Sequence, residues 1–450
     1  MGIRIRRLSL GLLFLFNLSY GLDLDKFPLN SEVDVTEYSK TQYGVELIGE
    51  KKKSPLAYTP KANSYDIKFR AKEYKIKVGD IVVYDLASDK SPYINILDYD
   101  KLTIKGDISQ CKLAISDRGL FLAEDNTPLK LKNGSVMIEE LYSKLDLTKL
   151  KSIILFKSNP KCSIKSISVS KTPKKEFSYS KDKATWLWNP KTPISMKKLK
   201  KYHINKMYIQ VRDGFEKRVS KLSRDGITIF GLNGSPKDIY NYEHLKKDIL
   251  LLAKLKKTIP NIKGYQIDVE PYTLREFSTD REATLKKYIN MIESLSSLCH
   301  KHNLQFSIVS PFWYHTIYYR YENLAQVVFK YADEVVLMSY RSDLSKVIDI
   351  SKEMLRMGEL SHKKVYLGVE LIKIPDEHHT RYKIVSIESC ITEKGFEKEC
   401  KKLEKLREYT VKGSSISFYN QIDKLSSIDD RDIPFSSFKG FVLHHYGVLP

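Results

Sequence analysis

The sequence contains few cysteines and lacks the short patterns that several large functional classes require. None of its five cysteines forms a Cys-x-x-Cys pair, and the histidine pairs have no cysteine partners, so we expect no metal site. No glycine-rich phosphate loop follows a predicted strand, and no serine or cysteine nucleophile motif is present. These absences argue against nucleotide-dependent and nucleophile-dependent enzymes, and we expect no cofactor.

Long apolar runs are also scarce, and the one at the N terminus predicts export. A basic start at residues 1–7 precedes the apolar run 8–18, and the small residues Ser19 and Gly21 follow it. No later segment approaches the roughly 20 apolar residues of a membrane-spanning helix. We therefore predict a signal peptide over residues 1–21, and a secreted or periplasmic protein with no integral membrane segment once the signal is removed.

Acidic residues are outnumbered by basic ones, 55 to 76, which gives a net charge of +21. Lysine supplies most of the excess, in short clusters such as residues 51–53 and 197–201, and no arginine-rich stripe or nucleic-acid motif accompanies it. We interpret the charge as solvated surface and expect no nucleic-acid partner. The same charge could attract an anionic wall or capsule polysaccharide.

The cysteines fit an oxidising compartment. Cys111 and Cys162 fall in one region and Cys390 and Cys400 in another, so two local disulfides are the simplest pairing. Cys299 stands alone in a helical pattern, which predicts a buried thiol.

The chain has room for about two or three domains, since 42% of its 450 residues are hydrophobic. Residues 22–64 are polar and irregular, which predicts a linker or extended arm. Residues 65–172 contain short alternating strands separated by Gly, Asn and Asp turns, the pattern of a β-sandwich. It resembles the accessory modules of secreted carbohydrate-active enzymes, although a purely structural sandwich fits equally well. Residues 173–183 predict a second linker.

From residue 184 to residue 450, apolar strands alternate with amphipathic helices. Eight strands separated by helices over this length predict an α/β fold, a (β/α)₈ TIM barrel. The segment between the last two strands is about 70 residues long, and such long loops are more often functional than filler. The predicted strands are 185–188, 207–211, 227–232, 265–269, 306–309, 335–339, 365–369 and 440–445; the predicted helices include 195–202, 214–224, 243–257, 281–302, 344–359 and 393–408.

Two carboxylates, Asp268 and Glu270, end the fourth predicted barrel strand. Alternate residues of a strand share a face, so both acids should point the same way. Burying a pair of carboxylates is costly, and catalytic residues of a parallel barrel come from the carboxyl ends of its strands. We therefore interpret the pair as catalytic, with one proton retained between two close carboxylates. Solvated acids at a strand end, or acids paired with lysines, are the alternatives.

Two motifs on the predicted strands resemble a known family. Gly264-x-x-x-Asp268-x-Glu270 looks like the fourth-strand motif of family-18 glycoside hydrolases, the chitinase-like barrels, and Met338-Ser339-Tyr340 is similar to that family's Met-x-Tyr signature on strand six. The resemblance implies that Glu270 is the general acid, that Asp268 orients the substrate's acetamido group and that Tyr340 hydrogen-bonds this group. The sugar's own carbonyl oxygen would then act as the nucleophile.

The chain departs from the family pattern at two places. Lys263 and Gln266 occupy the first two acidic positions of the strand-four motif, so the extended carboxylate relay is missing. The eighth strand normally ends near a tryptophan that floors the sugar pocket, whereas here it ends in residues 444–446, His-His-Tyr. These departures leave open the sugar and the retention of substrate assistance, and a related barrel family with a different sugar would also fit.

Further polar and aromatic residues follow the predicted strands and should line the same rim. Aromatic faces stack on sugar rings and fixed polar groups bind hydroxyls, so the set predicts a glycan cleft, although packing alone explains each aromatic taken singly. Because adjacent strand residues face opposite ways, only one of His444 and His445 should point inward. We expect His444 to bind substrate or Asp268, or to be a satisfied structural histidine. The substrate-binding candidates are Trp188, Arg212, Asn233, Tyr272, Trp313, Tyr314, Arg341, Glu370, His444 and Tyr446.

The sequence therefore predicts a secreted glycoside hydrolase that cleaves an amino-sugar-containing polysaccharide by general acid catalysis, with a glycan as its partner. The alternative is a non-catalytic glycan-binding or surface-interaction protein that retains the barrel.

Overall fold

The computed structural model forms two units, which are described separately. One unit is residues 1–54 with 373–416, and the other is residues 55–372 with 417–450. The predicted signal peptide and most of the linker 173–183 lie outside the described residues. The described residues are 29–30, 32–39, 42–47, 57–76, 79–86, 91–118, 126–157, 161–172, 182–223, 225–391, 397–419, 421–425 and 433–449.

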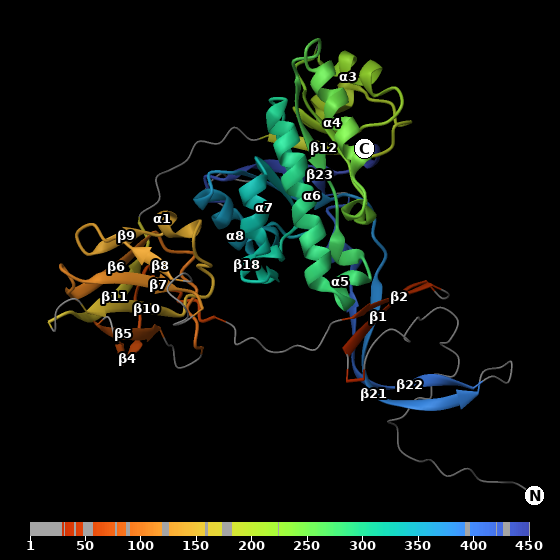
Figure 1. Ribbon diagram of the computed structural model, residues 1–450. Helices are drawn as coiled ribbons and strands as arrows, with labels where there is room; N and C mark the ends of the chain where they lie inside the picture. The colour runs from red at the N-terminus through yellow and green to blue at the C-terminus, as the bar shows by residue number, and fades with distance from the viewer. Residues whose placement is uncertain are drawn as a thin grey trace, which may run out of the picture. The chain divides into compact units, whose positions relative to one another are not determined.

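Eight parallel strands close into a barrel in the second unit, which confirms the predicted fold (Figure 1). Each barrel strand pairs in parallel with the next barrel strand, and the eighth pairs with the first. The strands form here because their apolar, often β-branched residues are buried on both faces, the pattern of a sheet covered by helices. The barrel strands are β12 (Asp182–Leu187), β13 (Lys206–Gln210), β14 (Thr228–Asn233), β15 (Ile262–Ile267), β16 (Gln305–Pro311), β19 (Glu334–Met338), β20 (Lys364–Glu370) and β23 (Phe438–His444).

Amphipathic helices follow most of the strands. The longest, α6 (Arg281–Lys301), begins at Asp280, whose side chain accepts a hydrogen bond from Ala283 N at 3.2 Å. Its buried residues recur at helical spacing and include Cys299, the free thiol that the sequence predicts. The other helices of the barrel are α2 (Met196–Lys201), α3 (Phe215–Ser223), α4 (Glu243–Leu255), α5 (Glu276–Thr279), α7 (Leu324–Tyr331) and α8 (Leu344–Leu360).

The amino-terminal end of the barrel is closed by a buried ion pair. Lys206 Nζ lies 2.5 Å from Glu334 Oε2, and the Tyr208 hydroxyl donates to Glu334 Oε1 at 2.8 Å. Both charged side chains begin their strands and are almost fully buried. This end of the barrel is therefore a packed and satisfied core, which leaves the opposite, carboxyl-terminal end for chemistry.

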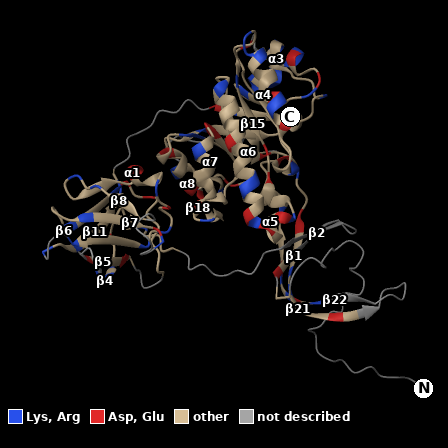
Figure 2. Ribbon diagram, viewed as in Figure 1, with Lys and Arg blue, Asp and Glu red and all other residues tan. Residues whose placement is uncertain are grey.

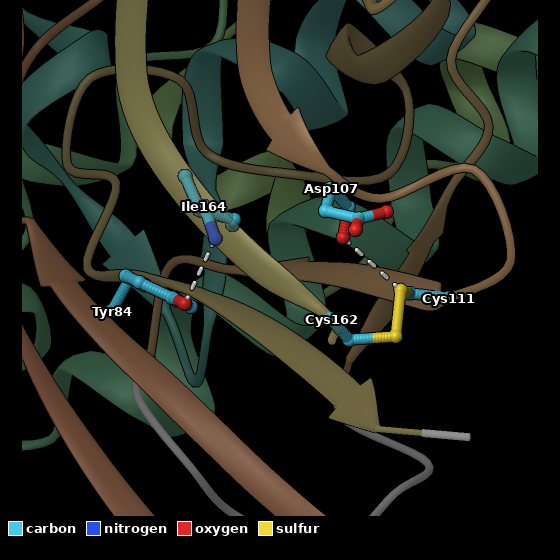
Figure 3. The surroundings of a disulfide bond; sticks show 5 residues. All are labelled: Tyr84, Asp107, Cys111, Cys162 and Ile164. Carbon is cyan, nitrogen blue, oxygen red and sulfur yellow. Dashed lines mark hydrogen bonds between the residues drawn. A yellow bond between two sulfur atoms is a disulfide. The ribbon is translucent and has the colours of Figure 1, made fainter. Parts of the chain in front are cut away.

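Two antiparallel sheets form the predicted sandwich. The Tyr84 hydroxyl of one sheet accepts a hydrogen bond from Ile164 N of the other at 3.0 Å, and the predicted disulfide between Cys111 and Cys162 is present beside it (Figure 3). One sheet has the order β4 (Phe69–Ile76), β5 (Gly79–Leu86), β10 (Ser152–Lys157), β7 (Lys112–Ser116) and β8 (Thr127–Leu129); the other has β3 (Ser64–Asp66), β11 (Ser163–Ser170), β6 (Lys101–Asp107) and β9 (Ser135–Met137).

Arg356 on α8 connects the barrel to the sandwich within the same unit. Its guanidinium donates to the backbone oxygens of Leu97 at 3.0 Å and Tyr99 at 2.6 Å, and it forms an ion pair with Asp100 at 2.6 Å. The side chain is only 7% exposed. A buried arginine that satisfies two carbonyl groups and a carboxylate is a strong directional contact.

The first unit contains a four-stranded sheet in the order β2 (Gln42–Leu47), β1 (Glu32–Ser39), β21 (Glu377–Ile391) and β22 (Glu397–Val411). Two strands thus form within the segment that we predict to be a linker. The predicted helix 393–408 is wrong, because most of its residues pair with β21 in β22. Its many Lys, Glu and Leu residues favour helix, but strand pairing overrides that weak preference. The side chains of Cys390 and Cys400 lie outside the described part, so their pairing stays a prediction.

Lys and Arg residues are interspersed with Asp and Glu residues along the described helices and strands (Figure 2). Among the described residues, no helix is long and apolar enough to cross a membrane.

Candidate active site

The two acids lie just beyond the end of β15, at the carboxyl end of the barrel. The strand itself stops at Ile267, but Asp268 N still donates to the backbone oxygen of Asn233 at 3.0 Å. Glu270 then precedes the short 3₁₀ helix η3 (Pro271–Thr273). Val269 between the acids is buried. Asp268 and Glu270, on either side of it, are partly exposed.

Asp268 has an unusual electrostatic environment. Its Oδ1 atom is buried and makes no hydrogen bond. Burial, and next the nearby Glu270 carboxylate, raise the pKa of Asp268 to about 7, while His444 acts in the opposite direction. Among the described residues, no lysine or arginine forms an ion pair with Asp268 or Glu270. Asp268 can thus hold a proton at neutral pH.

A tyrosine hydroxyl bonds Glu270, and two further aromatic side chains pack against that tyrosine. The Tyr272 hydroxyl donates a hydrogen bond to Glu270 Oε2. The Tyr272 ring lies 5.0 Å from the Trp313 ring and 6.3 Å from the Tyr314 ring, edge to face in both pairs. Tyr314 is buried. Three sequence-predicted aromatics from the loops after β15 and β16 therefore gather beside the acid.

Tyr340 follows β19 and approaches both acids. Burial raises the pKa of its hydroxyl well above the ordinary value, and the charges of Asp268, Glu370 and Glu270 raise it further. The hydroxyl therefore stays protonated and can donate a hydrogen bond at any physiological pH. Its ring lies 6.0 Å from the His444 ring.

Glu370, which is buried, and His444, which is partly exposed, form a dyad at the ends of β20 and β23. Glu370 Oε1 accepts hydrogen bonds from Leu371 N and Ile372 N, both at 2.8 Å, and Glu370 Oε2 lies 2.6 Å from His444 Nδ1. The His444 ring also meets the Trp186 ring at 5.7 Å. His444 therefore faces the barrel interior, as expected, but the His445 ring lies only 5.3 Å away instead of on the opposite side.

Other predicted residues make structural contacts. Asn233 donates to Asp248 of α4 at 3.0 Å, and the Tyr446 hydroxyl accepts from Ser195 N at 2.7 Å. Burial raises the pKa of Asp248, and the charge of the exposed Arg212 is a minor opposing influence. Arg341 donates to the backbone oxygen of Tyr340 at 2.7 Å, and Trp188 packs against the apolar barrel interior.

One neighbour of Asp268, Tyr288, was not among the predicted site residues. Tyr288 on α6 is fully buried, and burial, followed by the charge of Asp268, raises the pKa of its hydroxyl. Its helical spacing with other apolar residues indicates only a core position. Trp186 lies inside the barrel and donates to Gln266 Oε1 at 2.6 Å, while Gln266 Nε2 donates to Ser307 at 2.8 Å. Among the described residues, no His, Cys, Asp or Glu group could hold a metal ion.

The chain is a (β/α)₈ barrel with a carboxylate pair at the end of its fourth strand. Both motifs thus lie on the strands that the family-18 resemblance requires, β15 and β19, the fourth and sixth of the barrel. No family model and no curated protein matches the chain.

Several solved structures are similar to the chain at low identity. They include a chitinase from Chromobacterium violaceum ATCC 12472, with 10% identity, 60% of this chain and 95% of that chain covered, and a TM-score of 0.36. The spore cortex-lytic enzyme SleL from Bacillus megaterium QM B1551 has 10% identity, coverages of 64% and 76%, and a TM-score of 0.35. The glycoside hydrolase domain of PelA from Pseudomonas aeruginosa has 13% identity, coverages of 43% and 85%, and a TM-score of 0.29. Because these scores are low, we base the fold on the strand order and draw no functional conclusion from the likenesses.

Proposed function

We propose that the protein is a secreted glycoside hydrolase that cleaves an amino-sugar-containing polysaccharide by general acid catalysis. The supporting observation is the carboxylate pair of Asp268 and Glu270 at the carboxyl end of the barrel, where the pKa of Asp268 is raised to about 7. A pair that retains one proton at neutral pH is suited to protonate a leaving group. The disulfide in the sandwich supports an exported protein.

In the proposed reaction, Glu270 gives its proton to the glycosidic oxygen as the bond from that oxygen to the anomeric carbon breaks. The carbonyl oxygen of the sugar's acetamido group forms the new bond to that carbon, and water later opens the resulting ring. Asp268 accepts the acetamido N–H, and Tyr340 donates to the acetamido oxygen. Tyr272 holds Glu270 in place through its hydroxyl. Trp188 and Trp313, both partly exposed, are the proposed stacking surfaces.

Substitution of the proposed general acid tests the assignment. Glu270→Gln keeps the size of the side chain but cannot deliver a proton, so we expect hydrolysis of the best substrate from a panel of amino-sugar polymers to fall by about 10² to 10⁴ fold. Glu276→Gln is the matched control, because Glu276 is exposed in the same loop region at the start of α5. Full activity in Glu270→Gln would show that another group is the acid.

A non-catalytic glycan-binding protein is the second candidate, and Gln266 is the observation that favours it. Its amide oxygen accepts from Trp186 and its amide nitrogen donates to Ser307, and an amide cannot exchange a proton as an acid at this position would. Binding to wall glycans without any release of shorter chains by the unmodified protein would support this alternative and exclude the hydrolase.

A further inference from the structure

The loop after β16 carries aromatic side chains that lie beside Glu270, and it also reaches the sandwich. Trp313 in this loop packs edge to face on Tyr272 at 5.0 Å, and the Tyr272 hydroxyl bonds Glu270. Tyr318 begins the short strand β17 (Tyr318–Tyr319) further along the same loop. The position of Trp313 beside the acid therefore depends on what holds this loop.

Hydrogen bonds within the loop join Trp313 to Tyr318. The Trp313 backbone oxygen accepts from Thr316 N at 2.9 Å and from the Thr316 hydroxyl at 2.8 Å. Strand β17 pairs with β18 (Glu322–Asn323), which closes the loop. Because the loop is bonded to itself in this way, a contact that fixes Tyr318 also restricts Trp313.

A buried carboxylate of the sandwich accepts a hydrogen bond from the Tyr318 hydroxyl. Asp146 is 2% exposed, and its Oδ2 atom accepts from that hydroxyl at 2.5 Å. Its Oδ1 atom accepts from the backbone nitrogen and the hydroxyl of Thr148, at 3.0 and 2.6 Å. Lys149 Nζ lies 3.5 Å from the centre of the Tyr318 ring. Hydrogen bonds to a carboxylate are strong, and a buried carboxylate that loses a partner is destabilised, so the sandwich holds Tyr318 firmly.

The helix after the loop binds the same segment of the sandwich, residues 142–149. Gln326 on α7 donates to two backbone oxygens of this segment, at 2.8 and 2.9 Å. The sandwich is attached at a second place on α8, where Lys352 Nζ lies 2.8 Å from Asp98, beside the contacts of Arg356. The two places can therefore be perturbed separately, and the segment 142–149 is bonded to the loop that carries Trp313.

We propose that the sandwich positions one wall of the substrate site, with Tyr318 as the positioning residue that connects Asp146 to Trp313. The sandwich is then a fixed part of this site, and not a module tethered apart from it. Asp146 anchors the Tyr318 hydroxyl, and the closed loop keeps the Trp313 ring against Tyr272. The consequence for substrate binding rests on the proposed function, because Trp313 is one of the proposed stacking surfaces for a sugar ring.

The hold on the loop can be measured without any substrate. Fluorine NMR of the full chain labelled with 5-fluorotryptophan reports on its three tryptophans, and Trp313→Phe assigns the resonance of Trp313. Tyr318→Phe keeps the ring and removes the hydroxyl that Asp146 binds. We expect the Trp313 resonance to shift or broaden in this variant, while the other two stay in place. The matched control Tyr319→Phe removes the hydroxyl of the next residue and should leave all three resonances unchanged.

A second pair of variants separates this loop from the attachment of the sandwich in general. Gln326→Met removes both hydrogen bonds from α7 to the segment 142–149 and should also move the Trp313 resonance. Lys352→Met removes the ion pair on α8 and should leave that resonance unchanged. A Trp313 resonance that stays in place in Tyr318→Phe would overturn the proposal, and so would one that moves as far in Lys352→Met as in Tyr318→Phe. The other two tryptophan resonances report that the barrel has folded.

If the protein cleaves a glycan, kinetics give a further test. A stacking surface binds the substrate and the transition state alike, so Tyr318→Phe should raise KM by about 3- to 10-fold and keep kcat within about twofold. Tyr319→Phe should keep both constants. An unchanged KM, or a fall in kcat at constant KM, would contradict the positioning role. Absence of cleavage by the parent would count against the hydrolase, and the fluorine resonances would still decide whether the sandwich holds the loop.

Discussion

The raised pKa of Asp268 makes the stability of the barrel depend on pH. The ordinary value of 3.8 applies to the unfolded chain and about 7 to the folded one. Between these values the unfolded chain releases a proton that the folded chain keeps. The stability associated with the neutral carboxyl group is fully present below about pH 3.8 and is lost as the pH rises to about 7. A difference of about three pKa units corresponds to about 4 kcal/mol as an upper limit.

Asp268→Asn removes this dependence, because asparagine resembles the neutral acid and cannot ionise. We expect the variant and the parent to have similar free energies of unfolding at pH 4. At pH 8 the variant should be more stable by up to about 4 kcal/mol. Urea denaturation followed by tryptophan fluorescence measures this difference in the barrel itself, since all three tryptophans, at positions 186, 188 and 313, lie there.

Asp343→Asn is a control of opposite sign. Asp343 caps α8 by accepting from Ser345 N and Lys346 N, and hydrogen bonds led by that from the Ser345 side chain lower its pKa. The stability that the Asp343 carboxylate provides is present above its ordinary pKa and is lost as the pH falls. The variant should therefore be less stable than the parent at pH 7, and the two free energies of unfolding should converge in acid. A stability difference for Asp268→Asn that is the same at pH 4 and pH 8 would refute the assigned burial of this carboxylate.

Three further predictions concern the framework around the site. Cys111→Ser with Cys162→Ser should lower the free energy of unfolding of the sandwich by about 4 kcal/mol, measured by urea denaturation against the oxidised parent; their separation of 51 residues sets the magnitude. Arg356→Ala should lower the free energy of unfolding by about 3 to 5 kcal/mol and speed amide hydrogen exchange near Asp100. Unchanged exchange would show that this ion pair does not hold the segment around Asp100. Lys206→Met should destabilise the barrel by a similar amount, because it leaves the buried Glu334 without its cation. Adding Glu334→Gln should recover much of the lost stability, as measured by thermal denaturation.

The local pattern of the sequence was sufficient to predict the barrel and the position of its two acids. Eight apolar segments of strand length, separated by amphipathic helices, leave few arrangements that bury both faces of each strand. The spacing of Asp268 and Glu270 placed both at one end, because side-chain alternation follows from backbone geometry alone. The disulfide of the sandwich was likewise predicted from the positions of its cysteines along the chain, and the buried thiol of Cys299 from the helical pattern around it.

Tertiary contacts decided the features that the sequence did not predict, since these contacts join residues that are distant along the chain. The dyad connects Glu370 to His444 across 74 positions, and Trp186 bonds Gln266 across 80, separations at which no local pattern exists. The same reason explains the failed helix at residues 393–408, where pairing with β21 overrode local preference. Sequence alone therefore determined which residues lie at the carboxyl end of the barrel. Only the closed structure determined which of them face Asp268, because burial and charge depend on the packed neighbours.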